Sequence, residues 1–401
     1  MGRKSIRTRR NWLASCASVT AGLATLAGCT NSDETSDEPE NSEELPPTRW
    51  PMYGVDPQNT GHHPTANGPS GEDVEIQTII KADDAIHNNL TIDDNQLYAT
   101  SADGSLLSID ILENELEWAK NINTPSDGHP LITDGSIYTG IDQGLAAVNR
   151  KDGELRWKQD SLLWEVAPIP TSAGVIGTQN RILHQFDSET GNEDTVYNTR
   201  EKSASLPIST VPALNNGTAY FAAEDTLFSV NIENNELEWT FRNPYGELMG
   251  EVNPTVDDKT VYITGEGERL YAIDVKNGSK KWSIDTLENP GSPSLANGVI
   301  YLMAGGSVLT GGDVWLLAIS VDKKKIIWKK SLESRLKQKP VVTTGSVYHS
   351  NGDNIYSFDA KSGELQWQVM NYKENFTASP TVSDKYLYLP TEKGKICRIK
   401  D

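Results

Sequence analysis

A phrase of eleven residues recurs six times along this chain of 401 residues and constrains its fold more than any other feature. The phrase opens on a small residue, has Asp, Asn or Ser at its third position, passes through a turn and ends on Trp. A repeat at a fixed period indicates units that each bury an apolar face against the next. The copies are Ser108–Trp118, Ala147–Trp157, Ser229–Trp239, Ala272–Trp282, Ala318–Trp328 and Ser357–Trp367. A seventh copy, Gln185–Thr195, keeps the turn but has Thr195 in place of the tryptophan.

A short apolar strand follows about twenty residues after each phrase and sets the length of the unit. Its marker residues are Tyr98, Tyr138, Ile176, Tyr220, Tyr262, Tyr301, Tyr348 and Tyr388, separated by 38 to 47 residues. This spacing is typical of four-stranded propeller blades. Period-two apolar runs bounded by Gly, Asp and Asn indicate strands and hairpins, and helical periodicity is absent. The sequence therefore predicts an all-β fold, an eight-bladed β-propeller.

The two ends of the chain are predicted to complete the last blade together. The sequence stops at Ile396–Asp401, just after the third strand of the eighth copy. Twenty residues before Tyr98 lies Thr78, inside the strand-like run Val74–Ile80. We expect this N-terminal run to supply the missing outer strand, because such closure removes the open edges of a sheet.

Each recurring position of the phrase has a structural role. Asp or Asn at the third position accepts N–H groups of the following turn, and Gly at the seventh supplies the positive φ of a tight turn. The terminal Trp is a large flat ring that packs between neighbouring blades. The docking residues are expected to be Trp118, Trp157, Trp239, Trp282, Trp328 and Trp367.

The phrase A-x-D-x-x-T-G-x-x-x-W resembles the tryptophan-docking motif of pyrroloquinoline-quinone-like (PQQ-like) propeller repeats. That superfamily includes quinoprotein alcohol dehydrogenases and the outer-membrane assembly lipoprotein family BamB. The resemblance covers residues 74–401, and the segment Trp50–Gly61 also resembles the lead-in of extracytoplasmic members. It implies the fold and leaves the function open, since enzymes and scaffolds share these repeats.

Catalysis is the less favoured reading of the resemblance. Quinoproteins of this superfamily hold their cofactor with a vicinal Cys pair, a Trp floor and a Glu, Asn and Asp set that binds calcium. Beyond the signal the chain has only Cys29 and Cys397, and it lacks a haem-type C-x-x-C-H. We expect no catalytic residue, no metal and no cofactor; PQQ with calcium belongs to the alternative of a quinone-dependent dehydrogenase. The histidines show no metal spacing, and the pair His62-His63 is expected to be solvated.

The N-terminal region carries export signals. Arg9-Arg10 precedes an apolar run that ends at Leu26–Cys29, which resembles a twin-arginine (Tat-type) signal peptide with a lipobox. A transmembrane anchor is the alternative, but the apolar run is short for a span of ~20 residues. We expect residues 1–28 to be the signal, Cys29 to be lipidated, and 29–48 to be an acidic, disordered tether before the propeller at 49–401. The protein is then exported and lipid-anchored at the cell surface, on the outer face of the cytoplasmic membrane.

The formal net charge of −20 limits the partners. Such a surface repels nucleic acid and anionic headgroups. It is typical of halophilic acidic proteins, and the alternative is an acidic face for a cationic partner. The sequons at Asn89, Asn216, Asn277 and Asn375 are compatible with surface glycosylation.

The longer and more varied links predict the face used for binding. In a propeller the links from the second to the third strand, and from blade to blade, emerge together. The candidate partner-binding residues on these links are Trp164, Tyr245, Met249, Tyr372 and Phe376, for which local packing is the alternative. We expect a monomeric, non-enzymatic scaffold that binds proteins or peptides; an envelope glycan-binding module, with Trp164 and Tyr245 stacked on sugars, is another alternative.

Overall fold

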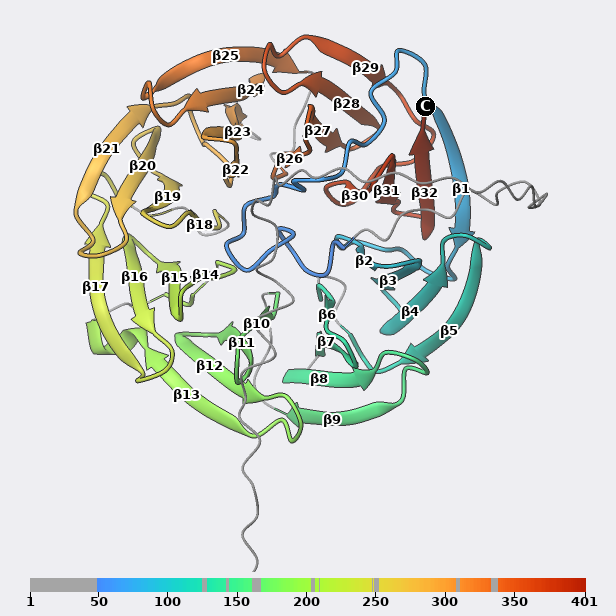
Figure 1. Ribbon diagram of the computed structural model, residues 1–401, viewed down its shortest axis with the longest axis horizontal. Coiled ribbons are helices and arrows are strands. Elements are labelled where there is room, and N and C mark those ends of the chain that lie inside the picture. The colour runs from blue at the N-terminus through green and yellow to red at the C-terminus, as the bar shows by residue number, and fades with distance from the viewer. Residues whose placement is uncertain are drawn as a thin grey trace, which may run out of the picture. The chain divides into compact units, whose positions relative to one another are not determined.

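The chain forms a ring of eight antiparallel sheets, each with four strands (Figure 1). The computed structural model describes residues 49–124, 128–141, 144–160, 167–202, 206–208, 210–246, 248, 252–307, 311–332 and 338–401, all within one compact unit from Leu45 to Asp401. The predicted all-β, eight-bladed propeller is confirmed. Within the described residues the one helix is the short η1 (Thr199–Lys202), and no helix there is long and apolar enough to cross a bilayer.

The strands follow one another from the axis to the rim in each blade. Blades 1 to 4 are β2 (Thr91–Asp93), β3 (Gln96–Thr100), β4 (Ser105–Asp110), β5 (Glu115–Asn121); β6 (Leu131–Ile132), β7 (Ser136–Ile141), β8 (Gly144–Asn149), β9 (Leu155–Asp160); β10 (Ile169–Pro170), β11 (Gly174–Gln179), β12 (Ile182–Asp187), β13 (Glu193–Asn198); and β14 (Ala213–Asn215), β15 (Thr218–Ala223), β16 (Thr226–Asn231), β17 (Glu236–Arg242).

Blades 5 to 8 continue the same order around the ring. They are β18 (Thr255–Val256), β19 (Thr260–Gly265), β20 (Arg269–Asp274), β21 (Lys280–Asp285); β22 (Ser294–Ala296), β23 (Val299–Ser307), β24 (Gly311–Ser320), β25 (Lys325–Leu332); β26 (Val341–Val342), β27 (Ser346–Asn351), β28 (Asn354–Asp359), β29 (Leu365–Val369); and β30 (Thr381–Ser383), β31 (Tyr386–Pro390), β32 (Lys395–Lys400), completed by β1 (Glu75–Lys81).

This order gives the ring two different faces. Turns from first to second and from third to fourth strands lie on one side, which we call the short-turn face. Links from second to third strands and from blade to blade lie on the other side, the long-loop face. The core is the set of apolar side chains between adjacent blades, and the middle strands are almost wholly buried.

The N-terminal strand closes the ring as the sequence predicts. β1 pairs antiparallel with β32, with Thr78 opposite Cys397 and Ile76 opposite Ile399. Figure 1 shows β1, in blue, as the outermost strand of the blade that carries the C-terminus. The edge of β32 that the end of the chain would leave open is therefore paired within the same chain.

The tryptophans dock through a shared hydrogen-bond acceptor. The Trp157 indole N–H donates to the Ser188 carbonyl (3.1 Å), and the Tyr138 hydroxyl donates to the same oxygen (3.3 Å). Trp328 and Tyr301 share the Ala360 carbonyl in the same way (3.1 and 2.9 Å). In both pairs the acceptor is the fourth residue of the phrase in the next blade. Trp239 donates to the Val275 carbonyl in the same way (2.9 Å), whereas the Trp118 indole N–H has no hydrogen-bond partner among the described residues and docks by packing alone.

At the two boundaries of blade 8, which lacks the phrase, other residues replace the missing parts. Trp367 Nε1 and the Tyr348 hydroxyl both donate to the carbonyl of Pro69, at 2.8 and 2.9 Å, so the N-terminal lead-in stands in for the turn. On the other side Arg398 Nη1 donates to the Ile111 carbonyl at 3.1 Å. Ile111 is the fourth residue of the first phrase, so a guanidinium supplies the donor that an indole supplies elsewhere.

The seventh copy of the phrase loses its tryptophan because its strand register differs. In the other six copies a β-bulge falls between the first and second residues of the phrase, which places Trp opposite the first residue. In blade 3 the bulge lies between Leu183 and His184, and Thr195 pairs with His184. Position eleven therefore turns to the other side of the sheet. Tyr197 packs against Phe228 of blade 4 instead, with ring centroids 6.1 Å apart.

The third-position side chains act as the sequence predicts. Asp110 Oδ1 accepts the N–H groups of Leu112 and Glu113 at 2.8 and 2.9 Å. The seventh-position glycines have a second role that the sequence does not predict. A Cβ added at Gly278 would lie 2.6 Å from the indole of Trp239, so the docked ring lies directly on the glycine.

The contact between glycine and indole predicts unequal costs for two alanine substitutions at similar backbone geometry. Gly278 (φ +69°) lies under Trp239, whereas Gly298 (φ +73°) has open space where its Cβ would be. Positive φ costs an L-residue about 1–2 kcal/mol at either position, and overpacking against the indole adds about 1–3 kcal/mol. In urea unfolding, Gly278→Ala should therefore lower the free energy of unfolding by about 1–3 kcal/mol more than Gly298→Ala does. Equal losses would contradict the docking arrangement.

Candidate functional site

The axis of the ring is occupied by the first part of the chain's own lead-in segment (residues 49–70), from Trp50 to Gly61. Figure 1 shows this segment, in blue, crossing the centre of the ring. Its carbonyls accept N–H groups of the innermost strands of six blades at 2.7–3.1 Å. The donor and acceptor pairs are Ile92 with Trp50, Ile132 with Pro51, Leu214 with Pro57, Val256 with Gln58, Leu295 with Thr60 and Val342 with Gly61. Blade 8 is joined through Asp384, whose carbonyl accepts the Asn67 N–H, while the described β10 receives no such bond.

A buried polar cluster holds the lead-in at the axis. Lys339, 7% exposed, donates from Nζ to the backbone carbonyl of Asn59 and, at 3.0 Å, to its side-chain oxygen. Asn59 Nδ2 donates to the Pro254 carbonyl at 2.8 Å. The Asp56 carboxylate accepts the Thr60 N–H at 2.9 Å. Together these bonds tie one loop of the lead-in to blades 5 and 7.

Burial shifts the pKa of both charged groups in this cluster. Burial lowers the pKa of Lys339 to about 7, and the negative charge of Asp56 opposes that shift. Burial also raises the pKa of the Asp56 carboxyl, against the effect of the Thr60 hydrogen bonds and of Lys339. Each charge is therefore costly to bury and depends on the other. We interpret this cluster as structural, since it holds the segment that fills the axis.

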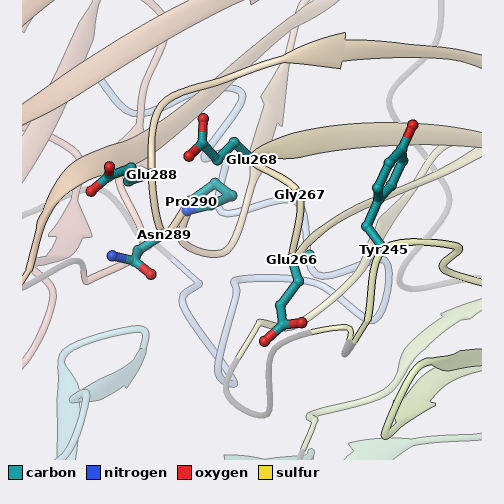
Figure 2. Close-up of a pocket in the computed structure, with 8 residues that line it drawn as sticks. Tyr245, Glu266, Gly267, Glu268, Glu288, Asn289 and Pro290 are labelled. Atoms are coloured by element: carbon teal, nitrogen blue, oxygen red, sulfur yellow. The ribbon is translucent and has the colours of Figure 1, made fainter.

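A pocket on the long-loop face is the candidate binding site. It has a volume of about 340 Å³ and is lined by residues of three consecutive links: Tyr245 from β17–β18, Gly265, Glu266, Gly267 and Glu268 from β19–β20, and Glu288, Asn289 and Pro290 from β21–β22. Figure 2 shows the three glutamates and the Tyr245 ring around it. Tyr245 is 58% exposed, the highest fraction among the large apolar side chains that the structure describes.

Charge and shape of this pocket suit a cationic group. Three glutamates line it, and the neighbouring Arg269 is paired with Asp285 at 2.6 Å while its guanidinium lies 5.3 Å from the centre of the Tyr245 ring. An aromatic ring beside carboxylates is a favourable environment for lysine or arginine side chains. Within the described residues no His, Cys, Asp or Glu group is placed to hold a metal ion.

Comparison with known proteins identifies the family. A family model described as outer membrane protein assembly factor BamB matches residues 73–159, 141–314 and 289–400. Together these ranges span the ring from β1 to its last strand. The chain belongs to the BamB family.

Individual BamB proteins and other propellers are similar to this chain at low identity. The chain is 23% identical over 294 residues to outer membrane protein assembly factor BamB of Moranella endobia, which covers 68% of this chain and 69% of that protein. The crystal structure of BamB from Moraxella catarrhalis aligns with a TM-score of 0.63 at 17% identity, over 82% of this chain and 100% of that one. Quinohemoprotein alcohol dehydrogenase from Comamonas testosteroni aligns at 0.68 and 11% identity, over 88% and 80%. Such structural likeness shows the fold alone.

The residues present do not fit the quinone site of the dehydrogenases. Cys397, the one cysteine among the described residues, lies opposite β1 in blade 8, where its sulfur is 3.5 Å from the Tyr372 hydroxyl. It has no neighbouring cysteine to form a vicinal pair. The axis is occupied by the lead-in and the Lys339 cluster. We therefore derive no step through PQQ or calcium for this member of the BamB family.

Several predicted site residues need correction or lie outside the described part of the chain. Phe376 is 1% exposed in the apolar core, so its candidacy for partner binding is wrong, because the ring packs between blades 7 and 8. Tyr372 stacks on Phe376 with centroids 5.0 Å apart and is half-buried. The solvated reading of His63 is also wrong. It is 7% exposed, stacks near Trp50, and burial lowers its pKa to about 4.

The remaining predicted residues have different outcomes. Cys29, Trp164 and Met249 lie outside the described residues. Tyr245 lies in the pocket at the surface, as a partner-binding residue requires. Of the four sequon asparagines, Asn216, Asn277 and Asn375 are exposed and Asn89 is half-buried.

Sequence reasoning missed Lys339, Asp56 and Asn59. One signal was present: most blades begin with a residue followed by Pro directly before the innermost strand, as in Asn253-Pro254 and Lys339-Pro340. At that position Asn253 and Lys339 both contact the lead-in, at Tyr53 and Asn59. A lysine directly before this proline therefore indicates a buried ammonium group, whereas most lysines in the sequence lie on the surface.

The lowered pKa of Lys339 predicts a measurable pH dependence. The folded chain binds fewer protons at this site than the unfolded chain between about pH 7 and the ordinary pKa of 10.5. Stability from this group therefore rises with pH across that window, by at most about 1.4 kcal/mol per pH unit. Chemical unfolding of the parent and of Lys339→Met at pH 7 and pH 9 should show the parent gaining stability relative to the variant. If the free energy of unfolding of the parent, relative to that of the variant, stays constant or falls from pH 7 to pH 9, the burial of the Lys339 ammonium is contradicted.

Proposed function

We propose that this member of the BamB family is a non-enzymatic, lipid-anchored, extracytoplasmic scaffold that binds protein or peptide partners on its long-loop face. The pocket beside Tyr245 carries this proposal. It is formed by three links of the predicted binding face, and it offers an exposed aromatic ring with three carboxylates. Aromatic side chains beside such pockets are typical hot spots of protein interfaces. The BamB relatives are named as outer membrane protein assembly factors, which supports a role with protein partners.

The occupied axis supports a scaffold over a propeller enzyme. A central site for a small substrate needs space on the axis, and here the lead-in forms hydrogen bonds with the innermost strands instead. Surface loops then remain as the part of the ring that is available for recognition. If the cell that makes the protein lacks an outer membrane, the assembly role does not transfer and the scaffold role remains.

Site-directed photo-crosslinking tests the binding face. In the full chain, Tyr245 is replaced by a photoreactive benzoylphenylalanine, and in a matched control Leu116, 48% exposed on the outer strand β5, is replaced in the same way. Irradiation in the producing cells should give a discrete protein adduct only from position 245. Recovery of that partner by affinity capture should fall at least about 30-fold for Tyr245→Ala, as for an aromatic hot spot of ~2 kcal/mol. Equal adducts from both positions, a glycan in place of a protein, or none at 245 would contradict the proposal.

The lipid anchor is tested separately. The proposed form begins at Cys29 and carries acyl chains on that residue, so intact-protein mass spectrometry should show the loss of residues 1–28 and the added lipid. Cys29→Ser should leave the chain unlipidated and shift it from the membrane fraction to the soluble extracytoplasmic fraction. An unmodified parent, or a variant that stays membrane-bound to the same extent, would contradict the anchor.

A further inference from the structure

Lysines gather on one sector of the ring although the chain as a whole is acidic. The lysine patch consists of Lys259, Lys276, Lys280, Lys281, Lys323, Lys324, Lys325, Lys329 and Lys330, and all but the half-buried Lys330 are exposed. They come from the turns of blades 5 and 6 on the short-turn face and from the outer strands β21 and β25 beside those turns. The same turns and strands carry five acids, so the lysines leave a local excess of positive charge on a chain of net charge −20; the acids are Asp257, Asp258, Asp274, Asp285 and Asp322.

Most of these ammonium groups are not neutralised by neighbours. Lys281 lies 3.6 Å from Asp274 and donates to the Lys259 carbonyl, and Lys329 lies 4.7 Å from the centre of the Trp315 ring. In the part of the chain that the structure describes, Lys280, Lys323 and Lys325 form no ion pair. Their charges are therefore available to an external anion.

The composition of the lysine patch distinguishes a membrane surface from a protein partner. Protein interfaces are depleted in Lys and rely on Arg, Tyr and Trp as anchors. The patch has no arginine, and Ile327, 37% exposed, lies among its lysines on β25. Anionic headgroups attract lysines as point charges, with about 1 kcal/mol per lysine near the surface, and an exposed apolar side chain adds contact with the lipid boundary.

The chain enters the ring on the same face. Arg49 forms ion pairs with Asp93 at 2.8 Å and Asp134 at 3.7 Å, at the ends of first strands on the short-turn face of blades 1 and 2. These blades lie across the ring from blades 5 and 6 (Figure 1). Twenty residues separate Arg49 from Cys29, a path of at most about 70 Å. If Cys29 is lipidated as proposed above, this path is long enough for the short-turn face to lie on the membrane.

We propose that the lysine patch is a contact site for anionic phospholipid headgroups, which lays the short-turn face on the membrane. A basic patch adds electrostatic attraction to the attachment that a lipid anchor provides. The ring then has two attachments on opposite sides of one face, and the pocket beside Tyr245 points away from the bilayer. The proposal differs from the expectation that the net charge alone gives, which is that anionic headgroups are repelled.

Vesicle co-sedimentation tests this contact in a chain that carries no acyl chains of its own. The full chain carrying Cys29→Ser is mixed at about 0.1 M salt with vesicles of phosphatidylcholine alone or with 30% phosphatidylglycerol. A patch variant, Lys280→Glu with Lys323→Glu and Lys325→Glu, is compared with a control, Lys81→Glu with Lys373→Glu and Lys393→Glu. The control lysines are exposed on the long-loop side of blade 8, so both triple variants change the net charge equally.

The expected result is selective binding to the anionic vesicles by the parent and the control. The patch variant should bind them about 100-fold more weakly, from about 1 kcal/mol for each of three lysines, and 1 M salt should abolish the difference. Equal binding by the two triple variants, or equal binding of the parent to both vesicles, overturns the proposal. Self-association of the parent that the patch variant loses, measured by sedimentation velocity without vesicles, assigns the patch to the acidic face of a second copy and also overturns it. This experiment uses no protein partner and no acyl chain on Cys29. A negative result would therefore contradict the headgroup contact without contradicting the proposed scaffold or the proposed lipid anchor.

Discussion

The ring depends on one repeated contact, in which the Trp of a blade packs on the turn of the next blade and, at four boundaries, donates its indole N–H to a backbone carbonyl there. The indole covers a glycine that has no Cβ and a backbone of positive φ, so ring packing and hydrogen bonding are fixed together. The arrangement persists at the boundaries of blade 8, where Pro69 replaces the acceptor and Arg398 replaces the donor. At these two boundaries another residue therefore supplies the hydrogen-bonding group that the phrase supplies elsewhere.

Closure of the ring creates a second requirement at its centre. Eight innermost strands present free N–H groups to the axis, and buried groups of this kind need partners. The lead-in segment supplies carbonyls to six of these strands, and Lys339 with Asp56 and Asn59 holds its loop in place. A dehydrogenase-like fold and a filled axis are thus compatible in one chain. The two faces differ in charge, with an acidic pocket on one and the lysine patch on the other.

The sequence predicted those parts of the fold that repeat. Eight copies of the same strand and turn pattern fix the number of blades, and the absent outer strand of the last copy leads directly to β1. Single-copy features were not predictable in this way. Nothing periodic marks the lead-in as an axial segment or Lys339 as buried, and Thr195 changes sides because of a displaced bulge that no residue type announces. Phe376 was misjudged because an aromatic residue on a loop looks the same in sequence whether it packs inward or outward.

Native-state hydrogen exchange of the closing seam tests the central claim most directly. If β1 and β32 form one sheet locked by the contacts at Pro69 and Arg398, the amides of Glu75–Lys81 and Lys395–Lys400 exchange together, and only when the ring as a whole opens. Rapid exchange of Glu75–Lys81, while β31 and the strands of blade 1 stay protected, would show that the two ends of the chain do not close the ring.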